Sequence, residues 1–181
     1  MRIPFYVHEG IDVIRPCKSD PFSAGTDFFI PNNAFLEINC GDVLETGGPG
    51  PTNKKITLSE SQKSIVINPG SSVKIHSGIS MEVDFSQMAL VCNRSGIASK
   101  NNLIVGAHVI DTWYTGEVCF DIHNIGSRGI RITAGDKITQ VVLVPIISAS
   151  FMEVSKDELY RSMVVTQVRG NAGFGASDQK K

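Results

Sequence analysis

Short runs of apolar and β-branched residues alternate with turn residues along most of the chain. The clearest predicted strands are 74–83, 89–93, 118–124, 129–133 and 140–147. In 118–123, apolar side chains occupy every second position, which is typical of a strand with one buried face, and the other face carries Cys119, Asp121 and His123. Short strands separated by Gly, Pro, Asn and Asp favour an all-β sandwich or barrel.

Three segments depart from this strand pattern. Residues 155–163 are predicted to form a helical turn or two, with Ser155 as the N-cap. Residues 41–64 are polar and rich in Gly and Pro, which predicts a long surface insertion. Residues 169–181 are mostly glycine and small polar residues, so this tail is either disordered or a strap that orders when something binds. We therefore expect one domain over 1–168, followed by a flexible tail.

Charge and length narrow the class of protein. The 181 residues suit a single domain, and 17 basic against 18 acidic residues, with no basic block, argue against a nucleic-acid-binding face. A small anionic ligand remains compatible, because it needs only two or three placed donors. The longest apolar run, 141–147, is interrupted by Pro145 and is far shorter than a membrane span. We expect a cytoplasmic protein without a membrane partner.

The cysteines do not suggest a metal or disulfide framework. Cys17, Cys40, Cys92 and Cys119 are scattered, with no Cys-x-x-Cys motif and no paired histidines. Zinc sites and disulfide scaffolds are usually marked by closely spaced ligands or by a shorter chain. The sequence therefore predicts reduced thiols.

Two segments carry candidate chemistry. In 93–98, Arg94 and Ser95 offer donors for phosphate oxygens, and Gly96 allows close approach of the backbone to an anion; the structural alternative is an ordinary turn after a strand. In 106–117, two apolar arms flank a polar turn, which predicts a β-hairpin with Asp111 and Tyr114 near its tip. A carboxylate there could activate water and an aromatic ring could face a sugar, whereas the alternative is a turn aspartate beside an exposed aromatic residue.

Five short motifs occur in a fixed order along the chain, and the order is more specific than any one of them. They are Ala-Gly-x-Asp ending at Asp27, Arg-Ser-Gly-x-Ala from Arg94, Val-Ile-Asp-x-x-Tyr-x-Gly around Asp111, Gly-Asp-Lys-Ile-x-Gln ending at Gln140, and Arg-Gly-x-x-Gly-Phe-Gly from Arg169. Together they resemble the trimeric dUTPase family over residues 21–177. The resemblance implies a jelly-roll-like β-barrel, a homotrimer with shared active sites and a mobile C-terminal tail. It also implies Mg²⁺-dependent hydrolysis of dUTP to dUMP and pyrophosphate by water attack at the α-phosphate.

The same resemblance implies roles for individual residues. Asp111 would activate the attacking water, Tyr114 would pack on deoxyribose, and Asp27 would help to hold Mg²⁺ through water. The residues implied to bind substrate are Arg94, Ser95, Gly96, Ala107, His108, Ile110, Tyr114, Gln140, Arg169, Phe174, Gly175 and Ser177.

Departures from the family pattern leave two alternatives open. His108 stands where these hairpins commonly carry glycine, and Asp121 falls where the related dCTP deaminases place a catalytic glutamate, so the first alternative is a dCTP deaminase or a bifunctional deaminase–dUTPase. The second alternative is a nucleotide-responsive regulator that binds a protein partner through the 41–64 insertion. The tail also has Ala172 in place of a usual glycine and Ala176 in place of a usual serine. The serine hydroxyl that is lost at 176 is a potential phosphate contact, and Ser177 could replace it.

Overall fold

The computed structural model describes residues 2–39 and 53–160, which are built mainly from short strands. The strands are β1 (Phe5–Val7), β2 (Thr26–Phe29), β3 (Phe35–Asn39), β4 (Asn53–Thr57), β5 (Ser64–Ile67), β6 (Ser72–His76), β7 (Ile79–Met81), β8 (Gln87–Asn93), β9 (Leu103–Val105), β10 (Val109–Ile110), β11 (Cys119–Asn124), β12 (Ile130–Thr133) and β13 (Lys137–Pro145). The helices are α1 (Ser95–Asn101) and α2 (Lys156–Tyr160). The chain divides into two compact units, Met1–Ile147 and Ser148–Lys181. The predicted boundary at 168–169 lies outside the described residues.

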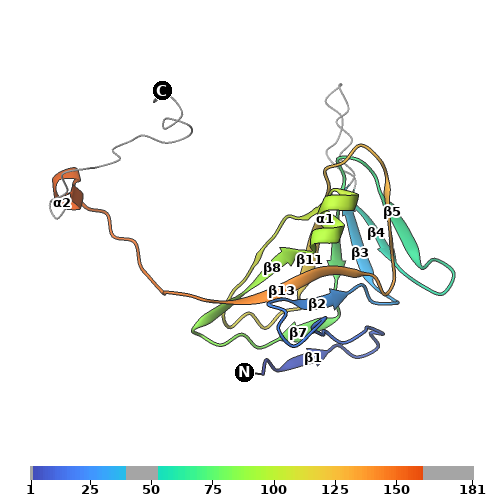
Figure 1. Ribbon diagram of the computed structural model, residues 1–181, viewed down its shortest axis with the longest axis horizontal. Coiled ribbons are helices and arrows are strands. Elements are labelled where there is room, and N and C mark those ends of the chain that lie inside the picture. Colours follow the sequence, from blue (N-terminus) through green and yellow to red (C-terminus); the bar gives the residue numbers. More distant parts are fainter. Residues whose placement is uncertain (1, 40–52, 161–181) are drawn as a thin grey trace. The chain divides into compact units, whose positions relative to one another are not determined.

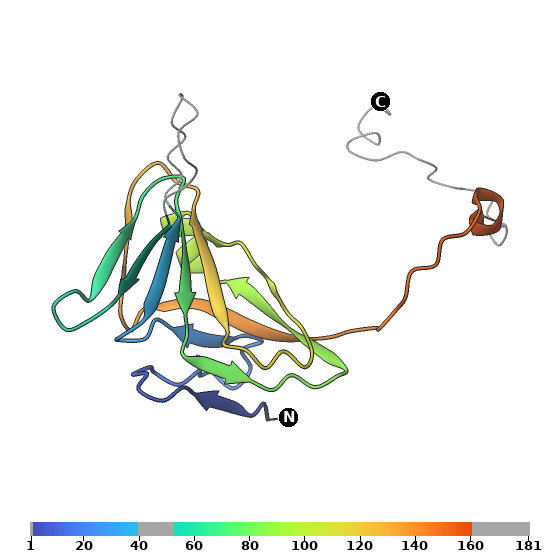
Figure 2. The same ribbon diagram turned by 180° about the vertical axis from the view of Figure 1, so that it is seen from behind.

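Two large antiparallel sheets make up most of the first unit. A four-stranded sheet has the order β10-β8-β13-β2, and a five-stranded sheet has the order β4-β3-β6-β11-β9. Figure 1 labels β8, β13 and β2 of the first sheet and β4, β3 and β11 of the second. Seen from behind, β3, β6 and β11 lie side by side as the blue, green and yellow strands of Figure 2. Two further pairs, β1-β7 and β12-β5, complete the described strands. The all-β prediction is confirmed, although the described strands form separate ladders rather than one closed barrel.

The core lies between the inner faces of the two large sheets. Leu36, Ile75 and Phe120 stand in register on three neighbouring strands and are fully buried. The Phe120 ring meets Phe28, from the other sheet, edge to face with 5.4 Å between centroids. Because side chains alternate along β11, burial of Phe120 directs its neighbours Cys119 and Asp121 to the outer face, as the sequence pattern predicts.

The segment after β8 forms a helix rather than the predicted turn. Helix α1 begins after Arg94, whose backbone is extended, and ends at Asn102, which adopts a left-handed conformation with φ of 53°. None of its residues is buried, and it contains Gly96 and Ser95, which have poor helix propensity. A seven-residue helix without a buried stripe has no periodicity for a sequence pattern to detect.

The predicted hairpin over 106–117 is also wrong in detail. Within 106–117 the only strand is β10, which pairs with β8, and no strand forms over 111–117. The next strand, β11, begins beyond the predicted hairpin and pairs with β6 and β9 in the other sheet, so the polar turn after β10 crosses from one sheet to the other. Alternation of apolar and polar residues does not show which strand pairs with which.

The described part of the predicted insertion is ordered in the sheet. Residues 53–57 form β4, the edge strand paired with β3, and Leu58 is 2% exposed. Residues 41–52 lie outside the described residues. The predicted helix cap is confirmed, because Ser155 Oγ accepts a hydrogen bond from the Glu158 N–H at 3.2 Å. In the described ranges, neither helix is long and apolar enough to cross a membrane.

Candidate active site

Three of the five sequence motifs meet at one polar hollow of about 380 Å³. Its lining residues are Ser19, Asp27, Arg94, Ser95, Gly96, Ile97, Lys100, Asn101 and Gln140. The strand register explains the meeting, because Gln140 on β13 stands opposite both Asp27 on β2 and Cys92 near the end of β8. The structure therefore brings together the predicted phosphate-binding residues Arg94, Ser95 and Gly96 with Asp27 and Gln140.

Asp27 is a buried carboxylate held by two cations. Its Oδ1 accepts a hydrogen bond from Arg94 Nε at 3.0 Å, and its Oδ2 accepts one from Lys137 Nζ at 2.9 Å and one from Ser19 Oγ at 3.0 Å. The Asp27 side chain is 6% exposed, whereas those of Arg94 and Lys137 are 30% and 36% exposed. Burial raises the pKa of Asp27, but the hydrogen bonds from Lys137 and Ser19 and the charge of Arg94 outweigh it, so the pKa is lowered overall.

The surroundings of Asp27 favour an anionic ligand. Arg94 and Lys100 line the hollow, and Lys137 contacts its carboxylate, so the cations outnumber the single negative charge of Asp27. Arg94 Nη1 also donates to the Lys137 carbonyl at 3.2 Å, which fixes the plane of the guanidinium. A fixed guanidinium beside Ser95 and Gly96 can donate to phosphate oxygens with little loss of side-chain freedom.

Gln140 explains the glycine of the first motif. Its Nε2 donates to the Asn93 carbonyl at 2.9 Å, which holds the amide against the buried Gly25. A Cβ built on Gly25 would overlap Gln140 Oε1 and lie 2.8 Å from its Cδ. Ala-Gly-x-Asp and Gly-Asp-Lys-Ile-x-Gln are therefore linked by close packing as well as by pairing of β2 with β13.

The third motif lies apart from this hollow within one chain. Asp111 is exposed, directly after β10, and its carbonyl accepts a hydrogen bond from the Tyr114 N–H at 3.3 Å. Trp113, between them, has a left-handed φ of 62° and is 75% exposed. Tyr114 is 46% exposed, and its hydroxyl donates to the Glu117 carbonyl at 3.0 Å. A Cβ on Gly116 would overlap the Tyr114 hydroxyl, so a larger residue there would displace the Tyr114 ring from its present position.

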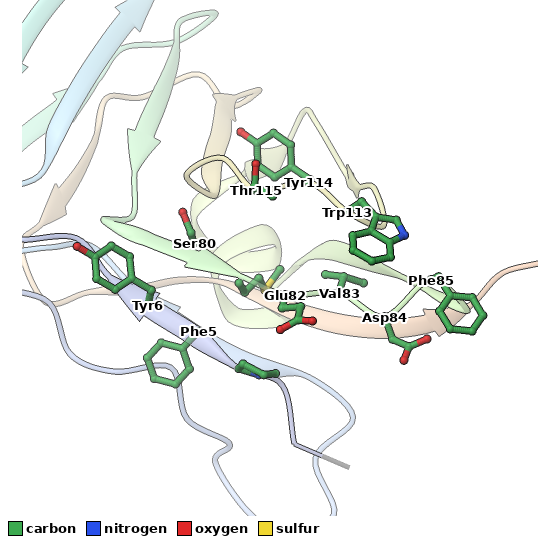
Figure 3. A pocket seen from close by; sticks show the side chains of 12 residues that line it. Phe5, Tyr6, Ser80, Glu82, Val83, Asp84, Phe85, Trp113, Tyr114 and Thr115 are labelled. Atoms are coloured by element: carbon green, nitrogen blue, oxygen red, sulfur yellow. The ribbon is translucent and has the colours of Figure 1, made fainter.

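Tyr114 and Trp113 line a second, largely apolar hollow of about 510 Å³ (Figure 3). Phe5 and Tyr6 on β1 lie at one end of it and Phe85 at the other. The two hollows have no lining residue in common.

Ala107, His108 and Ile110, which the family resemblance implies to bind substrate, lie at the edge of a sheet. Strand β10 is the last strand of the four-stranded sheet, so its second side has no strand partner among the described residues. His108 is tied to β8 twice: its carbonyl accepts from the Val91 N–H at 2.7 Å, and its Nδ1–H donates to the Val91 carbonyl at 2.8 Å. Ala107 is exposed and Ile110 is 8% exposed. The imidazole thus anchors this edge to β8.

Several other predicted residues lie elsewhere. Asp121 Oδ2 bonds His123 Nε2 at 2.8 Å on the outer face of β11, outside both hollows. Arg169, Phe174, Gly175 and Ser177 lie outside the described residues, so their roles stay predictions. Sequence reasoning missed Ser19, Lys100 and Lys137 as site residues. Lys137 was visible inside the fourth motif, but its contact with Asp27 depends on pairing across 110 residues.

The fit of the hollow to Mg²⁺ is indirect. Asp27 is the one carboxylate among the described residues that line it, and that carboxylate is already bonded to Arg94 and Lys137. Mg²⁺ in phosphate-processing sites keeps several waters and is held largely by substrate phosphates. The residues present therefore suit a metal ion that arrives with a polyphosphate and is contacted through water, and the role of Asp27 in holding it stays a prediction.

The chain is similar to dUTPases along most of its length. The dUTPase family model matches residues 59–177. A deoxyuridine 5'-triphosphate nucleotidohydrolase of Shewanella halifaxensis (strain HAW-EB4) is 38% identical over 159 residues, which cover 86% of this chain and 91% of the relative. A relative of the same name from Chlamydia felis (strain Fe/C-56) is 30% identical over 149 residues, covering 81% of this chain and 98% of the relative.

Solved structures share the fold at lower identity. A Staphylococcus bacteriophage 80alpha dUTPase with dUPNHPP matches with a TM-score of 0.68 and 18% identity, covering 97% of each chain. A dUTPase from phage phi11 of S. aureus matches with a TM-score of 0.63 and 17% identity, covering 86% of this chain and 97% of that one. These likenesses show the fold, and the match to the family model covers well over half of the sequence. The chain belongs to the dUTPase family.

Proposed function

We propose that the protein hydrolyses dUTP to dUMP and pyrophosphate in a Mg²⁺-dependent reaction and thereby limits incorporation of uracil into DNA. The family and the names of the relatives support this reaction. The positively charged hollow with Arg94, Ser95 and Gly96 supports binding of a triphosphate.

The observation that carries the proposal is the separation of the predicted catalytic parts. The phosphate-binding hollow contains Arg94 and Gln140, but neither Asp111 nor Tyr114. Asp111 and Tyr114 are instead presented on the exposed turn after β10. A homotrimer in which this turn of one protomer faces the hollow of the next would complete each active site.

In the proposed mechanism, the protein positions water and neutralises charge. The exposed Asp111 carboxylate aligns a water behind the α-phosphate and accepts its proton, a role worth about 10²–10⁴-fold in rate. Arg94 and Lys100 stabilise the charge that develops on the phosphate oxygens. Mg²⁺ would supply further charge neutralisation on the triphosphate, with Asp27 binding its waters. A solved phage phi11 dUTPase coordinates a structural Mg(II) ion.

Base and sugar selection follow from the turn and the strand edge. The free side of β10 can present main-chain donors and acceptors that match the edge of uracil, and a mismatched cytosine would leave buried polar groups unpaired. Tyr114 under the deoxyribose would exclude a 2′-hydroxyl. The tail, with Arg169 and Phe174, would close over the bound nucleotide and exclude water.

A substrate panel tests the reaction. Pyrophosphate release is measured with dUTP, UTP, dCTP and dTTP, with and without Mg²⁺, and ammonia release is measured with dCTP. We expect Mg²⁺-dependent pyrophosphate release from dUTP and no ammonia. Ammonia from dCTP would favour the deaminase alternative, and no pyrophosphate from any nucleotide would refute the proposal. The regulator alternative rests on 41–64, half of which lies outside the described residues, and it stays a prediction.

Mixing two inactive variants tests the shared site. Asp111→Asn removes the proposed general base from the exposed turn, and Arg94→Gln weakens phosphate binding in the polar hollow. In trimers assembled randomly from equal amounts, about one quarter of interfaces would join an intact hollow to an intact turn, so about a quarter of the wild-type activity should return. Each variant dissociated and reassembled alone is the control. If the complete site lay within one chain, the mixture would stay inactive.

A further inference from the structure

A cluster of metal-binding side chains lies on the outer face of the five-stranded sheet, away from both hollows. It consists of His76 at the end of β6, Cys119 at the start of β11 and Glu117 just before β11. Antiparallel pairing places Cys119 directly opposite His76. One ligand atom from each of the three residues lies within 4.8 Å of the others. None of the three lines either hollow.

The three potential ligand atoms face one another at short range. His76 Nδ1 lies 2.7 Å from Glu117 Oε2 and 3.6 Å from Cys119 Sγ. The other carboxylate oxygen of Glu117, Oε1, accepts a hydrogen bond from the Gly78 N–H at 2.6 Å. That bond orients the carboxylate so that Oε2 points at the imidazole. The side chains of His76 and Glu117 are 21% and 24% exposed, so solvent reaches them.

A second carboxylate holds the far side of the imidazole. His76 Nε2 lies 3.0 Å from Glu37 Oε1, and Lys74 Nζ donates to the same oxygen at 3.0 Å. Hydrogen bonds from His76 and Lys74 lower the pKa of Glu37 to about 2, so Glu37 is ionised at neutral pH and accepts a hydrogen bond from His76 Nε2–H. A histidine that donates one N–H to a carboxylate while its other nitrogen binds metal is a recurring arrangement in zinc sites.

We propose that His76 Nδ1, Glu117 Oε2 and Cys119 Sγ form a site for a zinc-like divalent transition metal, with Glu37 as the positioning residue behind His76. Imidazole, thiolate and carboxylate are the side chains that bind Zn²⁺, and a thiolate disfavours Mg²⁺. Tetrahedral Zn²⁺ places such ligand atoms about 3.3–3.8 Å apart. The observed 3.6 Å between sulfur and nitrogen fits, and the 2.7 Å contact between nitrogen and oxygen needs to widen by about half an ångström when an ion replaces the shared proton.

Metal binding at this site exchanges protons in a defined way. His76 Nε2–H donates a hydrogen bond to Glu37, and His76 Nδ1 faces Glu117 Oε2 at hydrogen-bond distance. Burial and the neighbouring Glu117 raise the pKa of the Cys119 thiol to about 11, so the sulfur is also protonated at neutral pH. The ion binds the sulfur as thiolate and releases its proton to solvent, takes the place of any proton that Nδ1 shares with Glu117, and leaves the Nε2–H bond to Glu37 intact. Water takes the fourth position, as in other three-ligand sites.

Sequence spacing does not reveal this site. His76 and Glu117 are 41 residues apart and only strand pairing brings them together, so the prediction of plain reduced thiols omitted it. The main alternative is a salt bridge in which protonated His76 joins Glu37 to Glu117, with Cys119 as a packing residue. That alternative predicts no metal affinity.

Titration of the chelator-treated, full-length protein with Co²⁺ in excess Mg²⁺ distinguishes the two. We expect one Co²⁺ per chain to produce a near-ultraviolet thiolate-to-cobalt absorption band, and Zn²⁺ to abolish it. Cys119→Ser should lose the band, whereas Cys92→Ala and Cys17→Ser, matched controls at other described cysteines, should keep it. Absence of the band from the wild-type protein, or its persistence in Cys119→Ser, would overturn the proposal.

Two further variants separate metal binding from simple structural support. Glu37→Gln should keep the band but weaken Co²⁺ affinity about 10–100-fold, because the amide orients His76 less strongly. His76→Gln should remove the metal-dependent rise in melting temperature that Zn²⁺ produces in the wild-type protein. Unchanged Co²⁺ affinity in Glu37→Gln, or the same Zn²⁺-induced rise in His76→Gln, would contradict the ligand assignment.

Discussion

The contact between Gly25 and Gln140 allows a quantitative test of how two distant motifs are joined. In Gly25→Ala, the new methyl group would overlap Gln140 Oε1 and lie 2.8 Å from Cδ and 3.1 Å from Cβ. The φ of Gly25 is not in the left-handed region, so an alanine backbone fits there and the strain comes from the side chain of Gln140. Gln140 must therefore move and give up its hydrogen bond to the Asn93 carbonyl.

The expected change in the free energy of unfolding combines two losses and one gain. Loss of the Gln140–Asn93 hydrogen bond costs about 0.5–1.5 kcal/mol. Crowding at a closely packed position costs about 1–3 kcal/mol, and replacement of glycine returns about 0.4–1 kcal/mol through the unfolded chain. Gly25→Ala should therefore lower the free energy of unfolding by about 2 kcal/mol, and Gln140→Ala alone by about 1 kcal/mol.

The double variant supplies the decisive measurement. Gln140→Ala removes the two closest atoms, so Gly25→Ala added to it should cost at least about 1 kcal/mol less than in the wild-type background. Urea denaturation gives the four unfolding free energies, and kcat/KM for dUTP should fall in both single variants because each displaces the Gln140 amide. Gly96→Ala, where a Cβ would meet nothing within 4 Å, is the stability control. Additive costs at Gly25 and Gln140 would refute the packing argument.

Three other predictions follow from the site. Asp27→Asn should lower the free energy of unfolding by about 2–4 kcal/mol, since Arg94 and Lys137 lose their shared carboxylate. Folding lowers the pKa of Asp27, so the stabilisation that its carboxylate gives is complete above about pH 4 and is lost in more acidic solution. The urea midpoints of the wild-type and variant proteins should therefore converge at acidic pH, and a difference between them that does not change with pH would contradict the ion-pair origin. Tyr114→Ala should raise turnover of UTP relative to dUTP while Tyr114→Phe does not, and an unchanged ratio would place sugar selection elsewhere. Truncation before Arg169 should leave a folded oligomer with low kcat, and full activity would exclude a role for the tail.

The fold class was predictable because burial alternates with period two in the strands. The outward positions of Cys119 and Asp121 on β11 followed from that pattern alone. The strand partners could not be predicted, because the alternation of apolar and polar residues within a strand does not show which other strand it pairs with. For this reason the predicted hairpin at 106–117 was wrong. Helix α1 was missed because it is short and buries none of its residues.

The sequence motifs identified which residues belong to the site. They did not identify the contacts among those residues, because these depend on how the strands pair. The motifs identified Asp27 and Arg94 but gave them separate roles, whereas the structure joins them in an ion pair with a third partner, Lys137. The anchoring of His108 to Val91 depends on the register of β10 against β8, which no local pattern specifies.

Strand β4 has a consequence for solubility. It is the edge strand of the five-stranded sheet, and its outer side pairs with no strand of the described residues, so its backbone groups there could recruit a strand from another molecule and begin amyloid-like growth. Lys54 and Lys55 lie on this strand and are both exposed. Stacking a second copy there would bring like charges together, so this lysine pair discourages intermolecular polymerisation, and its replacement by threonine would favour fibrils.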